Sequence, residues 1–119
     1  MFATAIGLLV VAAISGAVMI AYIFVGSVHP PMLLAIMHGS AAASAVILAV
    51  SSAITKGAST ALTLSLVVLI LALLGGLYLL AFHLQGKSHP RLVIALHALL
   101  ALGGFVGLAL AVLQAASAR

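Results

Sequence analysis

The sequence predicts an all-α membrane protein, one domain of four transmembrane helices in an up-down-up-down bundle. Three observations lead to this prediction. The 119 residues are 67% apolar and 3% charged, whereas a soluble domain carries roughly a quarter charged residues. Four apolar stretches, each longer than 20 residues, run through the chain. Only short links containing polar residues or prolines separate them, so lipid must be the solvent for most of the surface.

The four expected helices cover residues 2–25, 31–54, 60–82 and 92–116. At about 1.5 Å per residue, each can cross a hydrocarbon core of about 30 Å. The first stretch lacks the basic start of a signal peptide and is too long for its apolar segment, so we expect it to remain in the mature protein. Because the links GSVHPP, TKGAS and HLQGKSHPR are short, consecutive helices should be antiparallel neighbours.

The charged residues restrict the partners but barely determine the orientation. The chain has no Asp, Glu or Cys, which excludes thiolate metal sites, and its four cations are too few and scattered for nucleic acid. Lys56 and Arg119 fall on the side of the two termini, whereas Lys87 and Arg91 fall on the other, so the positive-inside rule does not choose. We expect a multi-pass protein of a bacterial inner membrane with cytoplasmic termini.

The chain contains an internal repeat. When it is shifted by 60 residues, its scarce residues coincide. The coinciding pairs are Gly16 and Gly76, Gly26 and Gly86, His29 and His89, Pro30 and Pro90, and, after a gap of one residue, His38 and His97. The halves, about residues 1–55 and 60–116, are therefore predicted to be tandem helical hairpins related by a pseudo-twofold axis along the membrane normal. Such an axis makes the second and fourth helices parallel and places His38 and His97 at the same depth, facing each other across the core.

The two histidines inside the helices need polar partners. His38 and His97 lie roughly 10–12 Å beyond the prolines that start their helices. Hydrocarbon offers no hydrogen bonds, and the chain has no carboxylate. The remaining partners are a backbone carbonyl, the other histidine, a cofactor, or a hydroxyl of Ser40, Ser44, Ser51 or Ser52. Two neutral imidazoles suit one metal, and they complete an iron already held by a porphyrin, whereas bare Zn²⁺ requires four ligands.

Small residues near the histidines would leave room for a flat macrocycle. They are Ala41, Ala42 and Ala45 after His38, and Ala101 and Gly104 after His97. On the first and third helices, Gly16 and Gly76 lie about 15 Å inside the bundle, close to the depth of the histidines. Glycine permits close approach, so these helices should form walls for the ring. Helix contacts without any cofactor are the alternative role for the glycines, and they account well for Gly103, Gly104 and Gly107.

His38, His97, Gly16 and Gly76, set in two hairpins, resemble the haem-binding four-helix core of membrane b-type cytochromes. The resemblance covers the whole chain as an arrangement and is not a distinctive sequence motif. It implies ligation from the second and fourth helices and glycines on the first and third. Quinol-oxidising cytochromes b carry two ligands on each ligating helix, whereas this chain carries one. The resemblance therefore implies a single haem b near the His-Pro links, with His38 and His97 as metal ligands.

The other polar residues at the His-Pro end are candidates for contacts with the haem propionates. His29, His89, Lys87 and Arg91 lie on that side, although a histidine before a helix-starting proline is more often a simple interfacial residue. His83 has no counterpart, because Ile23 occupies the equivalent position. It could contact a propionate, serve as a spare ligand, or extend to the interface.

These observations favour an electron-transfer subunit with one bis-His haem. We expect it to exchange electrons with quinone or another redox centre inside a larger membrane complex. Without a carboxylate to relay protons, an accessory role is favoured over catalysis. The alternatives are a cofactor-free structural or anchor subunit, and a subunit that binds one chlorophyll-type pigment per histidine. A small exporter is disfavoured, because four-helix exporters of this length use a membrane-embedded carboxylate.

Overall fold

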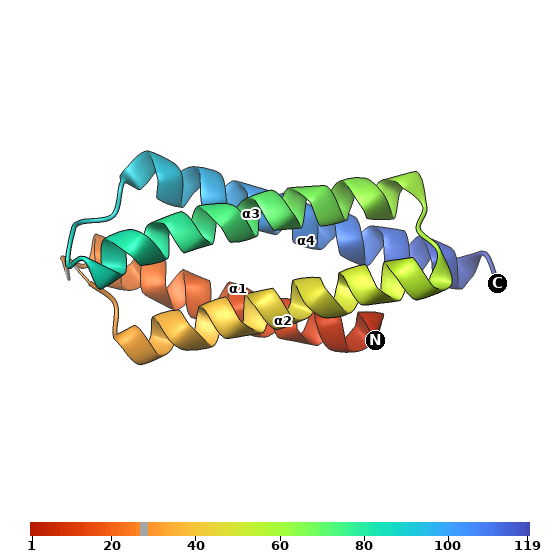
Figure 1. The fold of residues 1–119 in the computed structure, drawn as a ribbon, viewed down its shortest axis with the longest axis horizontal. Coiled ribbons are helices and arrows are strands. Elements are labelled where there is room, and N and C mark those ends of the chain that lie inside the picture. Colours follow the sequence, from red (N-terminus) through yellow and green to blue (C-terminus); the bar gives the residue numbers. More distant parts are fainter. Residues whose placement is uncertain (27–28) are drawn as a thin grey trace.

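The computed structural model describes residues 1–26 and 29–119, and within them it contains four α-helices (Figure 1). They are α1 (Phe2–Phe24), α2 (Met32–Lys56), α3 (Thr60–Leu84) and α4 (Arg91–Ser117). The predicted helices agree with these bounds within two residues at every end. Residues 27 and 28 of the predicted first link lie outside the described part of the chain. All four helices are long and apolar enough to cross a membrane, which confirms the predicted transmembrane bundle.

Local sequence explains where the helices begin and end. Pro90 stands immediately before α4 and Pro31 before α2, so proline occupies the capping position and not the first helical residue. The hydroxyl of Ser59 accepts a hydrogen bond of 3.2 Å from the backbone N–H of Leu62, which caps α3. Gly26 and Gly86, which the repeat relates, both adopt positive φ after α1 and α3, a conformation that favours glycine.

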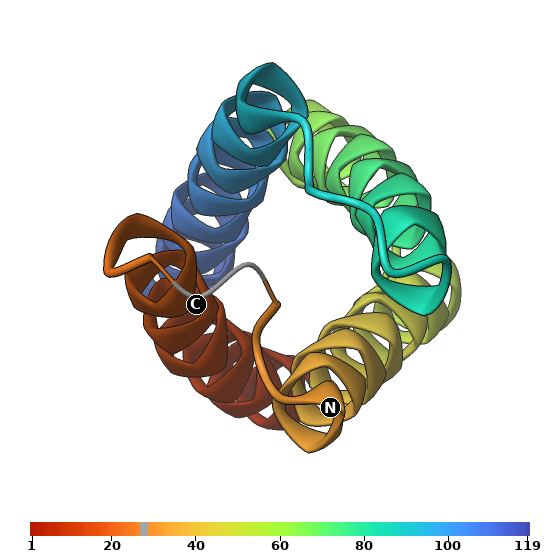
Figure 2. The same ribbon diagram turned by 90° about the vertical axis from the view of Figure 1, so that its left-hand side faces the viewer.

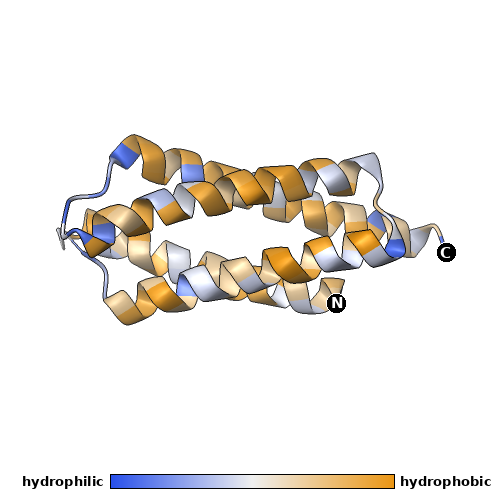
Figure 3. Cartoon of the chain, viewed as in Figure 1, coloured by the Kyte–Doolittle hydropathy of each residue, from blue (hydrophilic) through white to orange (hydrophobic). Residues whose placement is uncertain are grey.

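The helices form a ring in which consecutive helices are neighbours (Figure 2). Contacts are most extensive between α1 and α2 and between α3 and α4, the two predicted hairpins. Helices α2 and α4 therefore lie on one diagonal, and α1 and α3 on the other. Both termini and the α2–α3 turn lie at one end, and the two His-Pro links lie at the other (Figure 1). Apolar residues cover the helices, while hydrophilic residues concentrate towards the ends (Figure 3).

The interior differs between the two ends of the bundle. We call residues 1–11, 45–71 and 105–119 the terminal half, and residues 12–44 and 72–104 the His-Pro half. The terminal half contains every buried leucine and valine of the described chain, namely Leu9, Val46, Leu62, Leu66, Leu69 and Leu108. In the described part of the His-Pro half, the buried apolar side chains of helices are all alanines, namely Ala12, Ala35, Ala41 and Ala72. Large apolar side chains of the described helices are therefore fully buried only in the terminal half.

Candidate functional site

The structure brings His38 and His97 together across the bundle. The two rings come from α2 and α4, their centroids are 6.0 Å apart, and their planes make an angle of 76°. Both side chains are half-buried. Two parallel helices on one diagonal thus present equivalent imidazoles to each other, as the repeat predicted.

A backbone carbonyl is the polar partner of each ring. His38 Nδ1 lies 2.8 Å from the carbonyl oxygen of Ala12, and His97 Nδ1 lies 2.7 Å from that of Ala72. Because a carbonyl only accepts, both Nδ1 atoms must carry the proton, and a neutral ring then has its lone pair on Nε2. Neither Nε2 atom has a hydrogen-bond partner among residues 1–26 and 29–119. These two Nε2 atoms, each with a free lone pair, are the atoms that a metal would bind.

The two carbonyls show that the repeat extends to the contacts of the histidines. Ala12 and Ala72 are related by the same 60-residue shift, and each lies in the helix that precedes the histidine within its own hairpin. The candidate serines of α2 do not provide the partner. Ser15 of α1 has its Oγ 3.4 Å from His38 Nδ1. Sequence reasoning named a carbonyl as an option but could not identify it, because any residue type supplies one.

Gly16 and Gly76 lie against the histidine rings themselves. A methyl group at Gly16 would stand 3.0 Å from Cε1 of His38, and one at Gly76 would stand 3.0 Å from Cε1 of His97. The expected role of these glycines was to form walls for a macrocycle. In the structure they make room for the imidazoles, because the helices of each hairpin pack closely, and their role as walls for a macrocycle stays a prediction.

The three glycines of α4 that were assigned to helix contacts divide into two groups. Gly104 packs against Leu69, and Gly107 packs against Ser65, so both serve the close contact between α3 and α4. Among residues 1–26 and 29–119, no atom outside the surrounding turns of α4 lies within 4 Å of the position that a Cβ at Gly103 would take. Gly103 is therefore not a packing residue, contrary to the helix-contact role expected for it.

The residues present fit a bis-imidazole metal group. The two ring centroids are 6.0 Å apart, and the Nδ1 atoms are already engaged by carbonyls, so the two free Nε2 atoms could hold one metal. The Nδ1–carbonyl bonds orient both rings in the way that second-shell acceptors orient metal-binding histidines. The buried apolar residues near His38 and His97 are all small: Ala12, Ala35, Ala41 and Ala72.

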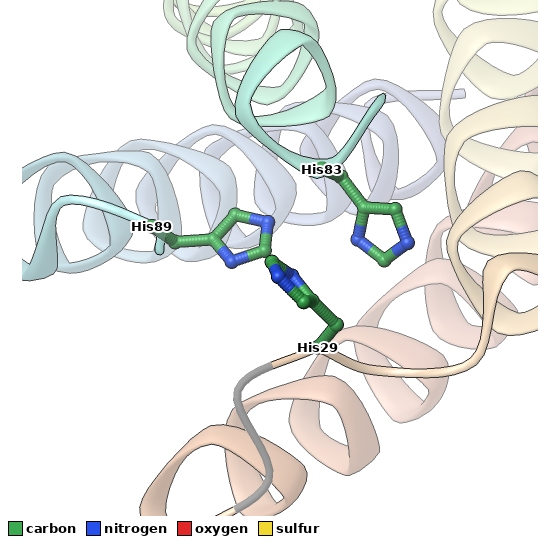
Figure 4. Close-up of side chains that lie close together, drawn as sticks. All are labelled: His29, His83 and His89. Carbon is green, nitrogen blue, oxygen red and sulfur yellow. The ribbon is translucent and has the colours of Figure 1, made fainter. Parts of the chain in front are cut away.

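A second group of histidines lies at the His-Pro end (Figure 4). His29 comes from the first link, His83 from the last turn of α3, and His89 from the second link. Their ring centroids are 5.5–5.7 Å apart, and one ring nitrogen of each lies within 4.8 Å of the others. Burial, followed by the neighbouring His83 and His29, lowers the pKa of His89 from its ordinary value of 6.5.

Sequence reasoning placed these three histidines at one end but did not predict that they converge. His29 and His89 were related by the repeat, whereas His83 had no counterpart and no expected neighbour. The sequence feature that could have indicated this convergence is that all three histidines lie in, or within one turn of, the two His-Pro links. Lys87 and Arg91 are exposed at this end, and Arg91 lies beside Ile20 and Ile23 of α1.

No known protein family, no curated protein and no solved structure matches this chain. Its function must therefore be inferred from the two histidine groups and the bundle that holds them.

Proposed function

We propose that the chain is a membrane cytochrome b subunit that carries one haem b between His38 and His97. One observation carries the proposal. Two repeat-related imidazoles face each other at 6.0 Å, each donates from Nδ1 to an equivalent carbonyl, and each keeps Nε2 without a partner in the described chain. Such a group, when bound, exchanges single electrons without needing an open position at the iron.

Different residues of the chain would orient the ligands, leave space for them and contact the propionates of this group. The carbonyls of Ala12 and Ala72 fix the tautomer and raise the basicity of the ligating nitrogen. Gly16 and Gly76 keep the rings from being pushed out of place. Lys87 and Arg91 are the exposed cationic groups at the end where propionates would emerge. Electron exchange with quinone or another redox centre in a larger bacterial membrane complex, with the termini in the cytoplasm, completes the proposal.

A cofactor-free anchor subunit is the second candidate, and the same hydrogen bonds support it. A histidine that donates to a carbonyl has satisfied one of its two nitrogens without any ligand. A pigment bound to each histidine would use the same two Nε2 atoms but would require two rings.

The absorption spectrum of protein purified in detergent from haem-sufficient cells separates these candidates. We expect a Soret band with sharp α and β bands on reduction and one haem b per chain. His38→Ala and His97→Ala should each abolish or convert this spectrum, while His89→Ala should retain it as a matched histidine control. Colourless protein would favour the anchor, and extraction of a chlorin would favour the pigment. An unchanged spectrum in both variants would refute ligation by this pair.

A further inference from the structure

We propose that His29, His83 and His89 bind a transition-metal ion of the zinc class, which joins the two hairpins at the His-Pro end. This site is separate from the His38–His97 pair and does not depend on haem binding. Its three ligands come from the first link, from α3 and from the second link (Figure 4).

The unpartnered nitrogens are the first argument for this site. The Nδ1 atoms of all three histidines are buried and have no hydrogen-bond partner in the described part of the chain. His83 is 9% exposed, so its ring cannot readily satisfy this atom with bulk water. A buried polar atom without a partner is costly, and three of them from one cluster indicate a shared missing partner.

The hydrogen bond of His29 is the second argument. Its Nε2 lies 3.1 Å from the carbonyl oxygen of Gly86, which only accepts, so the proton of the neutral ring is on Nε2. The lone pair is consequently on the buried Nδ1 atom. A backbone carbonyl that fixes the tautomer is the usual outer contact of a metal-binding histidine.

The distances require a small adjustment. Donor atoms around a tetrahedral zinc with Zn–N bonds of about 2.0–2.1 Å are roughly 3.3 Å apart. The ring nitrogens here lie within 4.8 Å of one another, so the three rings must move inward. Two of them are on the links between helices, where side chains and backbone can adjust without disturbing a helix.

The ligand chemistry selects the metal. Three neutral imidazoles with no carboxylate or thiolate in the chain suit Zn²⁺, Cu²⁺ or Ni²⁺ and do not suit Mg²⁺ or Ca²⁺. Three protein ligands leave the fourth position of a tetrahedral ion for water.

The position of the cluster gives the ion a structural effect. In the described His-Pro half, no buried leucine or valine holds the hairpins together. An ion bound by His29 of the first hairpin and by His83 and His89 of the second would provide that connection. A ligand that binds the native state but not the unfolded state raises the stability of the native state.

Equilibrium dialysis of EDTA-treated protein against Zn²⁺ tests the proposal. The protein is purified in detergent on a tag without histidines, and bound metal is counted by elemental analysis. We expect one Zn²⁺ per chain, with affinity reduced at least about tenfold by His29→Ala, His83→Ala or His89→Ala. His38→Ala is the matched control and should retain the ion. Zn²⁺ should also raise the melting temperature of the parent protein but not that of His89→Gln.

Three outcomes would overturn the site. They are no binding of Zn²⁺, affinity unchanged in all three variants, and loss of the ion in His38→Ala to the same degree. Because His89 lies outside the helices, His89→Gln should fold and can still test the site if His83→Ala does not fold. Haem content is measured on the same samples, so a failure of the haem proposal and a failure of the metal proposal give different results.

Discussion

The terminal half and the His-Pro half of the bundle are made from the same four helices but have different interiors. In the terminal half, leucines and valine from all four helices are buried, and alanines let the helices approach. In the His-Pro half, the interior contains alanines and five half-buried or buried histidines. Within lipid, packing between helices is a main source of association. We therefore expect the terminal half to carry most of the stability.

Truncating a buried leucine should have the largest effect on stability. Leu108 is fully buried in the terminal half, whereas Leu80 is half-buried in the His-Pro half. Leu108→Ala should lower the free energy of unfolding by about 2–5 kcal/mol, because it leaves a cavity, and Leu80→Ala should lower it by about 1 kcal/mol or less. Unfolding in mixed micelles with increasing denaturing detergent measures both. Equal losses would contradict the proposed division of stability.

Adding a methyl group at the boundary of the two halves should have the next largest effect. At Gly104 it would lie 2.7 Å from Cγ and 3.1 Å from the backbone nitrogen of Leu69, so α3 and α4 must separate. Gly104→Ala should cost about 1–3 kcal/mol. Gly103→Ala, which meets no atom within 4 Å, should be neutral or stabilise by up to about 1 kcal/mol through helix propensity. The same unfolding assay compares them, and a loss in Gly103→Ala similar to that in Gly104→Ala would show that contact with Leu69 is not the cause.

Methyl groups next to the histidine rings should change the site more than the stability. Gly16→Ala and Gly76→Ala each place a carbon 3.0 Å from a ring Cε1, so the ring must shift by a few tenths of an ångström. The free energy of unfolding should change by less than about 1 kcal/mol, because the gain in helix propensity offsets the crowding. Haem content and the position of the reduced α band should change in both variants and stay constant in Gly7→Ala. Unchanged spectra in both variants would show that Gly16 and Gly76 do not influence the proposed haem site.

The smallest effect should come from the buried serines of the terminal half. Ser52 is fully buried, and its hydroxyl has no hydrogen-bond partner among the described residues. Ser52→Ala should be neutral or stabilise by up to about 1 kcal/mol, because it removes an unpaired polar group. Ser65 is the matched control, since its hydroxyl donates to the carbonyl of Ala61 at 2.8 Å and packs against Gly107. Ser65→Ala should destabilise, and the reverse order in thermal melts would refute this assignment.

The sequence determined the fold and one of the two histidine groups. The length of the apolar stretches predicted the helices, because an apolar segment that crosses a membrane has few possible structures other than a helix. The short links predicted which helices are neighbours. The repeat then placed His38 opposite His97. The carbonyl partners could not be predicted, because they depend on how the helices are rotated within each hairpin. The convergence of His83 with His29 and His89 depends on the shape of the links, which composition does not specify.

The hydrogen bonds from His38 to Ala12 and from His97 to Ala72 both remain inside a single hairpin. Each two-helix unit thus orients its own imidazole without help from the other. A unit with an even number of membrane crossings keeps its direction when it is copied in tandem, so both copies present their histidine at the same height. This arrangement is what tandem duplication of a single hairpin would produce, with the short segment between Lys56 and Thr60 joining the two copies.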